Sequence, residues 1–176
     1  MNHLDKPLFV YGTMLDRDVA EIVLGRVLDP ARVCRAWLDG YRVVRIRDDT
    51  YPMLIEAPGE HVAGAVIHDL DRTALDRVRF FESYEYDFVE CTVRIPDHGY
   101  RRAARFGAAH EPPQQPEPWS LEWWRATHKD RFLRYVRDFM AFYGCGTLDE
   151  AEARWLELER EDERRARQRT QSASAN

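Results

Sequence analysis

Two segments far apart in the sequence carry residue types that could support acid–base chemistry. The first is Tyr11-Gly12-Thr13-Met14, which follows a short apolar run and precedes the acidic start of an amphipathic segment. A loop between a strand and a helix start presents backbone N–H groups that can hold a carboxylate or a developing oxyanion. An ordinary strand-to-helix connection explains this segment equally well.

The second segment contains Glu82, an acid that the helical pattern places away from solvent. A helix is predicted over about 71–82, with Ala74, Leu75 and Val78 as its apolar stripe. Glu82 follows Leu75 by seven residues, so the helical period places it on nearly the same, core-facing side. A carboxylate there costs free energy unless it is paired or functional. Desolvation should raise its pKa, which suits a general base.

The elements that must position these residues are mostly strands. Apolar, β-favouring runs predict strands at 8–10, 32–37, 41–46, 51–55, 61–67, 86–95 and 102–108. Asp39-Gly40 predicts a tight hairpin, and Pro58-Gly59 predicts a turn between two further strands. Gly64 marks a bulge or a close backbone contact. A helix should begin near Asp16 and end at Gly25.

The C-terminal part is predicted to be helical after a proline-rich connection. Residues 110–118 hold four prolines and predict an extended loop. One helix is predicted over 119–143, with His128 on its aromatic face as a packing residue or, less simply, a catalyst. A charged helix follows over 147–169, with a thin stripe of Leu148, Ala151, Trp155 and Leu158. It is either a solvated helix or a docking surface anchored by Trp155.

The predicted organisation is one domain with an appendage. Residues 1–146, including the 119–143 helix, form the domain, and 147–176 form the charged helix with a disordered end from Ser172. Because the apolar stripe is thin, we expect truncation before Thr147 to leave a folded protein. Truncation before Trp119 should instead cause aggregation, since an aromatic cover would be lost.

Composition excludes several classes of function. The net charge of -5 over 176 residues disfavours nucleic acid and acidic membranes as partners. The three cysteines, Cys34, Cys91 and Cys145, form no disulfide framework and no metal-binding spacing. With no long apolar run and no signal peptide, we expect a soluble, cytoplasmic protein without metal or cofactor.

Several motifs, in order and spacing, resemble the gamma-glutamylcyclotransferase-like family. They are Phe9-Val10-Tyr11-Gly12-Thr13-Met14, Tyr51-Pro52, Val62-x-Gly64-x-Val66 and Phe81-Glu82-x-x-x-Tyr86. A further motif is similar to the tail helix of the plant avirulence-induced branch, Trp119-x-x-Glu122-x-Trp124-x-x-x-His128-x-x-x-Phe132. The resemblance covers residues 7–143. It implies an α+β fold, a small mixed β-barrel flanked by helices, to which the last helix is an extension.

The resemblance also implies an activity, the release of 5-oxoproline from a γ-glutamyl amine or peptide. By this resemblance Glu82 is the catalytic acid/base and Tyr11-Gly12-Thr13-Met14 cradles the substrate. We extend the expected substrate contacts to Leu15, Asp16 and Tyr86, although packing explains Tyr86 equally well. The expected partner is a small γ-glutamyl substrate, and the expected state a monomer or weak homodimer.

Two residues depart from the family pattern. Arg79 stands where an acid is often found three residues before the catalytic glutamate, and Ser83 stands where a glycine follows it. Arg79 is one helical turn from Glu82, and pairing between them would lower the carboxyl pKa and weaken the base. The alternative function is therefore a non-catalytic module that binds a small carboxylate ligand or a partner on the same fold.

Overall fold

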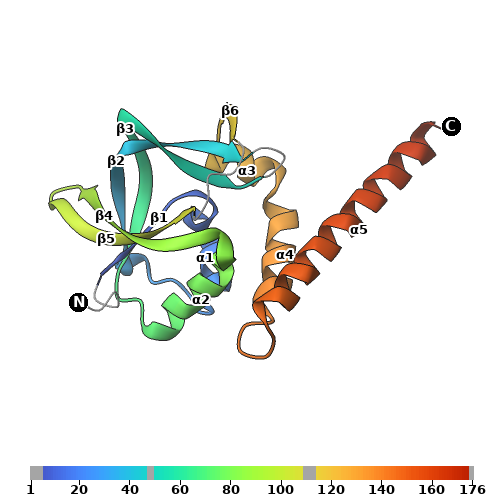
Figure 1. Cartoon of the computed structure of the whole chain (residues 1–176), viewed down its shortest axis with the longest axis horizontal. Helices are drawn as coiled ribbons and strands as arrows, with labels where there is room; N and C mark the ends of the chain where they lie inside the picture. Colours follow the sequence, from blue (N-terminus) through green and yellow to red (C-terminus); the bar gives the residue numbers. More distant parts are fainter. Residues whose placement is uncertain (1–5, 47–49, 109–113, 175–176) are drawn as a thin grey trace.

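The strands of the protein hydrogen-bond around a ring. The computed structural model describes residues 6–46, 50–108 and 114–174, and its six strands are β1 (Leu8–Val10), β2 (Val33–Ile46), β3 (Pro52–Ile67), β4 (Tyr86–Ile95), β5 (Gly99–Ala108) and β6 (Gln114–Pro118). They follow the order β3-β1-β5-β4-β2-β6, and β2 pairs again with β3, which closes the ring (Figure 1). β1 and β5 are parallel and the other pairs antiparallel. The predicted α+β class is confirmed.

The short strand β1 lies between two hydrophobic clusters. Its side chains alternate between faces, so Phe9 packs with Val66 and Val93 in one cluster, while Leu8 and Val10 join the helices in the other. All three residues of β1 are buried. A strand covered on both faces reads as a continuous apolar run, which is why β1 is evident in the sequence.

Within the described residues five α-helices accompany the strands: α1 (Arg17–Leu24), α2 (Arg72–Glu82), α3 (Leu121–Thr127), α4 (Lys129–Met140) and α5 (Leu148–Ser174). The predicted starts of α1 and α2 are confirmed. The Asp16 side chain caps α1 by accepting from the Asp18 N–H, and the Asp71 side chain caps α2 by accepting from the Ala74 N–H. Gly25 ends α1 in the left-handed region, at φ 69°. Among the residues described, no helix combines the length and apolar character needed to cross a membrane.

The predicted hairpin at Asp39-Gly40 is wrong. β2 runs straight through this pair and stays paired with β3, while the register jumps from Asp39 opposite His61 to Tyr41 opposite Glu56. Pro58-Gly59 lies inside β3 at the same irregularity instead of separating two strands. A bulge with Gly40 at φ 84° bends both strands without reversing the chain.

The single helix predicted over 119–143 is also wrong. The chain breaks at His128, where φ is −128° and ψ −20°, so that α3 and α4 are separate helices. The His128 ring packs edge-on against Trp123, with 4.7 Å between ring centroids. Upstream, the expected extended loop contains β6, which pairs with β2. Prolines are tolerated there because β6 is an edge strand; residues 109–113 lie outside the described part.

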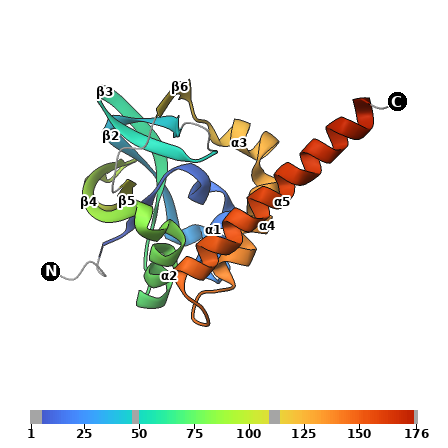
Figure 2. The same cartoon turned by 45° about the vertical axis from the view of Figure 1, so that its right-hand side comes forward.

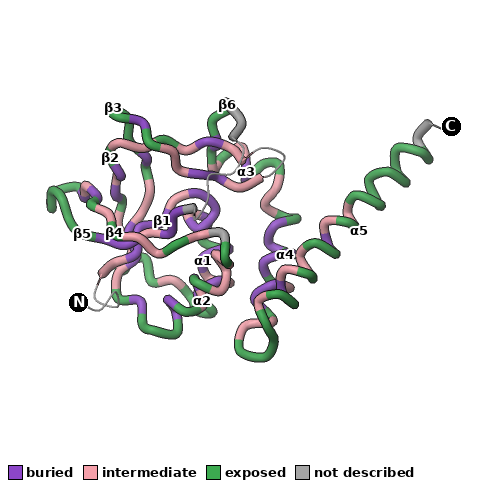
Figure 3. The backbone as a smooth tube through the Cα atoms, in the orientation of Figure 1, coloured by how far each residue is buried: buried purple, intermediate pink, exposed green. Residues whose placement is uncertain are grey.

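The last helix, α5, is longer than predicted. It continues to Ser174, so the disorder predicted from Ser172 is wrong for residues 172–174. Figures 1 and 2 show the far half of α5 projecting away from the other elements, and Figure 3 shows it exposed. The near half packs beside α4, with Ala151 and Leu158 buried.

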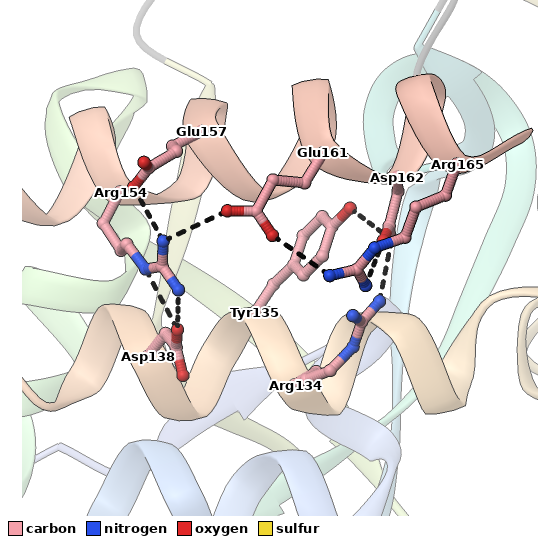
Figure 4. Close-up of polar contacts among 8 residues, drawn as sticks. All are labelled: Arg134, Tyr135, Asp138, Arg154, Glu157, Glu161, Asp162 and Arg165. Carbon is pink, nitrogen blue, oxygen red and sulfur yellow. Dashed lines mark hydrogen bonds and ion pairs between the residues drawn. The ribbon is translucent and has the colours of Figure 1, made fainter. Parts of the chain in front are cut away.

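Polar contacts align α5 with α4 (Figure 4). Arg154 of α5 binds Asp138 of α4 at 2.9 Å. Asp162 accepts from Arg134 at 2.7 Å and from the Tyr135 hydroxyl at 2.8 Å. The Arg134 and Arg154 side chains are partly exposed, so solvent weakens these ion pairs, and they fix the register of the helices more than they stabilise them.

Trp155 is the main apolar contact of α5. Its ring lies 5.6 Å from Phe132, 5.2 Å from Tyr135, 5.9 Å from Phe139 and 6.0 Å from Tyr51, measured between centroids. Ala151 belongs to the same hydrophobic cluster as α1, α2 and α4. The near half of α5 therefore shares the main core, and truncation before Thr147 should destabilise the protein, contrary to the expectation from its thin stripe.

We predict that Trp155→Ala lowers the free energy of unfolding by about 3 kcal/mol, because it removes a large ring from an aromatic cluster. Urea denaturation followed by circular dichroism measures this change. The control is Arg164→Ala on the exposed half of α5, which should stay within about 0.5 kcal/mol of the wild type. Equal stability of the two variants would show that α5 is only an appendage.

Candidate functional site

A cavity of about 440 Å³ lies where β1, the following turn, the end of α2 and the near half of α5 meet. Its walls are mainly aromatic and aliphatic, with a few acids and hydroxyls. The lining residues are Leu8, Phe9, Val10, Tyr11, Thr13, Met14, Tyr51, Pro52, Val78, Phe81, Glu82, Ser83, Tyr84, Tyr86, Phe106, Phe139, Glu152, Trp155, Leu156 and Glu159. A concave, mostly apolar cavity with few polar groups is typical of a small-molecule site.

The structure brings most of the predicted site residues to this cavity. Glu82 lines it together with Tyr11, Thr13, Met14 and Tyr86. The three other predicted substrate contacts are outside the lining: Gly12, Leu15 and Asp16. The two segments singled out in the sequence thus meet at one cavity.

Gly12 shapes the turn that carries Thr13 and Met14. The segment Gly12–Leu15 is a short 3-10 helix, closed where the Asp16 N–H donates to the Thr13 carbonyl at 2.9 Å. Gly12 has φ +71°, and a Cβ there would lie 2.2 Å from Cγ of Pro52. Only glycine fits both the dihedral angle and the contact. The first N–H groups of such a turn have no acceptor within it.

Asp16 has a structural role and does not line the cavity. It is 1% exposed and accepts from Arg125 at 2.7 Å and Lys129 at 3.0 Å. Burial alone would raise its pKa, but the hydrogen bonds and charges of Arg125 and Lys129 outweigh burial and hold the pKa below its usual value. Asp16 therefore fastens the start of α1 to α3 and α4.

Tyr11 and Glu82 interact across the cavity. Burial raises the pKa of the Tyr11 phenol, the negative charge of Glu82 raises it further, and Arg105 opposes both. The phenol therefore stays neutral and can donate a hydrogen bond. Its hydroxyl lies 3.4 Å from the carbonyl oxygen of Phe106.

The two residues that depart from the family pattern have distinct surroundings. Arg79 lays its guanidinium 5.3 Å from the centroid of Phe88. Ser83 ends α2 at φ 59° and ψ −158°, a conformation that glycine adopts far more easily. Its hydroxyl donates to Glu152 of α5. The Ser83 side chain thus links the end of α2, directly after Glu82, to α5.

Sequence reasoning missed the contribution of α5 to the cavity. Glu152, Trp155 and Glu159 line it, and their spacing of three and four residues places them on one helical face. That spacing was visible, but it could not reveal which surface the face would cover. Among the described residues, no group of three or more His, Cys, Asp or Glu is arranged to hold a metal ion.

The fold and this cavity define a class, a small α+β protein whose cavity brings a carboxylate at the end of a helix, Glu82, to a glycine-shaped turn. A family model described as gamma-glutamyl cyclotransferase, AIG2-like, matches residues 8–126. This is more than half of the chain, and the protein belongs to that family.

A plant relative agrees with this assignment, and two solved structures share the fold. AIG2-like protein D of Arabidopsis thaliana is 26% identical over 135 residues, covering 75% of this chain and 87% of the relative. A solution structure from the same plant is similar with a TM-score of 0.56 at 24% identity, covering 80% of this chain and 84% of the other. A second one has a TM-score of 0.55 at 23% identity, covering 81% and 95%. These likenesses support the fold.

We predict that Gly12→Ala lowers the free energy of unfolding by about 2 kcal/mol more than Gly40→Ala does, because only Gly12 adds a clash to its backbone strain. The control is matched, since Gly40 has φ +84° but a Cβ added there would meet nothing within 4 Å. Chemical denaturation of both variants measures the difference. Equal losses would mean that Pro52 moves aside easily.

We also predict a pH-dependent loss of stability for Asp16→Asn, about 2 kcal/mol at pH 7, because the two charge-assisted hydrogen bonds weaken. Since the folded-state pKa is depressed, Asp16 stabilises the protein above the unfolded value near pH 4, and the contribution disappears as pH falls through the folded value. Stability curves of wild type and variant should therefore converge in acid.

The control for Asp16 is Asp18→Asn on the same helix. Asp18 also binds Lys129, at 2.7 Å, but 57% of its side chain is exposed, so its loss should cost less than about 1 kcal/mol. A gap between wild type and Asp16→Asn that persists unchanged at low pH would argue against the charge-based account.

Proposed function

We propose that this protein is a gamma-glutamylcyclotransferase, releasing 5-oxoproline from a γ-glutamyl amine or peptide. The observation that supports this proposal is the meeting of Glu82 with the Tyr11-Gly12-Thr13-Met14 turn on one cavity of about 440 Å³. Membership in the gamma-glutamyl cyclotransferase, AIG2-like family supports this reaction class.

The reaction is a cyclisation within one substrate molecule. Glu82 takes a proton from the α-ammonium group, and the freed amine attacks the δ-carbonyl carbon of the same glutamyl residue. A C–N bond forms and closes the five-membered lactam, while the original amide C–N bond breaks. The proton held by Glu82 goes to the leaving nitrogen as that bond breaks. Glu82 then takes the second proton from the new ring nitrogen and passes it to the departing amine, which leaves as an ammonium ion. One carboxylate thus serves as base and as acid.

The remaining requirements are positional and electrostatic. Because nucleophile and carbonyl share one molecule, the site gains rate mainly by holding the folded conformer. The apolar walls exclude water and strengthen every polar interaction inside. Backbone N–H groups of the Gly12–Leu15 turn serve as donors to the oxyanion, as rigid groups that need no reorganisation.

We predict that Glu82→Gln lowers the rate of 5-oxoproline release by about 10²–10⁴-fold, the usual contribution of a positioned acid/base, because the amide cannot accept the ammonium proton. Chromatographic detection of 5-oxoproline from γ-glutamyl compounds measures it, with thermal unfolding of the same sample as a check on folding. Binding should weaken less, since the turn is unchanged.

The matched control is Asp76→Asn, which neutralises an exposed carboxylate on the same helix, α2. This variant should keep wild-type turnover. If Glu82→Gln turned over normally but melted earlier, Glu82 would be structural. A wild-type protein that binds γ-glutamyl compounds without releasing 5-oxoproline would instead be a binding module.

A further inference from the structure

The cavity contains more negative charge than the proposed reaction uses. Its described lining holds three carboxylates, Glu82, Glu152 and Glu159, but no lysine, arginine or histidine. The reaction employs Glu82 alone. The two others come from α5, which begins at Leu148 and so lies beyond the family match at residues 8–126.

The two carboxylates of α5 are held at the cavity by side-chain hydrogen bonds. Glu152 accepts from the hydroxyl of Ser83. Glu159 accepts from the indole N–H of Trp155 at 3.0 Å. A carboxylate has about four acceptor sites, so each keeps capacity for a ligand donor. Because the two acids are two helical turns apart, they span roughly 10 Å of the cavity wall.

Aromatic rings accompany these carboxylates in the cavity lining. Trp155 and Tyr51 both line the cavity, with their centroids 6.0 Å apart and their planes tilted by 42°. The face of an aromatic ring attracts a cation, most strongly for tryptophan. A cavity whose walls combine apolar side chains, aromatic rings and acids is therefore suited to an alkyl chain that ends in an ammonium group.

The position of Glu82 indicates which part of the substrate reaches α5. The leaving nitrogen must approach Glu82 to receive its proton, while the glutamyl part occupies the Gly12–Leu15 turn. Ser83 directly follows Glu82 and bonds to Glu152. On the proposed function, the group beyond the leaving nitrogen therefore extends beside α5, where Glu152 and Glu159 line the cavity.

We propose that Glu152 and Glu159 make α5 the wall that selects the leaving amine, favouring γ-glutamyl amines whose leaving group carries a second positive charge, such as an alkyl diamine. The inference rests on the proposed function and deepens it. Both acids act through electrostatic attraction to the distal positive charge, and the order of bond changes in the cyclisation is unaffected.

A smaller cavity beside the first one offers a competing arrangement. It has a volume of about 160 Å³, shares Tyr51, Trp155 and Glu159 with the main cavity, and contains His128 and Arg131. Burial lowers the pKa of His128, and the charges of Arg131 and Arg45 lower it further, so His128 is mostly neutral near pH 7. An anionic leaving group that reached Arg131 would still pass the carboxylate of Glu159.

The test compares three γ-glutamyl amides of equal chain length on the full-length protein. Their leaving amines are 1,4-diaminobutane, 1-aminobutane and 4-aminobutyrate, which are cationic, neutral and anionic at the distal end. We expect kcat/KM for 5-oxoproline release to be at least about tenfold higher for the diamine derivative than for the butylamine derivative, and lowest for the aminobutyrate derivative. The preference should shrink at high ionic strength.

The variants assign that preference to α5. In the double variant Glu152→Gln, Glu159→Gln, the ratio between the diamine and butylamine derivatives should fall toward one, chiefly through KM. Glutamine keeps an oxygen acceptor for Ser83 and Trp155, which preserves folding. The control Glu163→Gln neutralises an exposed acid of α5 away from the cavity and should keep the wild-type ratio.

Calorimetric titration with free 1,4-diaminobutane, and 1-aminobutane as the matched ligand, tests binding without turnover. Tighter binding of the diamine to wild type, lost in the double variant, supports the inference. Equal kcat/KM for the three amides, a preference that survives in the double variant, or a faster aminobutyrate derivative would overturn it while leaving the proposed function intact. Absence of 5-oxoproline from every amide would overturn the proposed function and, with it, this inference.

Discussion

The contact of β1 with β3 is the constraint on which the site depends. A Cβ at Gly64 of β3 would lie 2.5 Å from the Phe9 ring and 2.5 Å from the Val10 carbonyl oxygen, and one at Gly12 would meet Pro52 of β3. The missing side chains let β1 lie tightly in the ring and let the chain turn sharply after it. The direction of that turn determines which residues face the cavity. The close packing at Gly64 and Gly12 therefore sets the position of the candidate site.

The opposite wall of the cavity has a different origin. The family match ends at residue 126, whereas α5 covers Leu148–Ser174 and contributes four lining residues, Glu152, Trp155, Leu156 and Glu159. Glu82 and the Gly12–Leu15 turn thus lie within the family match, and the cavity wall formed by α5 lies outside it. Function resides in sites placed on folds, and here the two halves of one site come from separate parts of the chain.

Ser83 shows how a departure from the family pattern is accommodated. A non-glycine residue at φ 59° and ψ −158° stores backbone strain of about 1–3 kcal/mol. The hydroxyl that glycine lacks donates to Glu152, and a hydrogen bond to a charged group offsets much of that strain. The same bond holds α5 against the end of α2. Ser83, a departure from the family pattern, therefore connects the end of α2 to the cavity wall formed by α5.

The sequence by itself determined the local elements: the buried strand β1, the limits of α1 and α2, and the placement of Glu82 at the end of α2. These depend on capping residues, periodicity and a glycine stop, which act over a few neighbours. Only the tertiary structure decided that Asp39-Gly40 is a bulge, that the chain breaks at His128, and that Trp155 covers an aromatic cluster. The pattern of a helix face or a turn does not indicate which segment packs against it, because that is decided by packing between segments far apart in the chain.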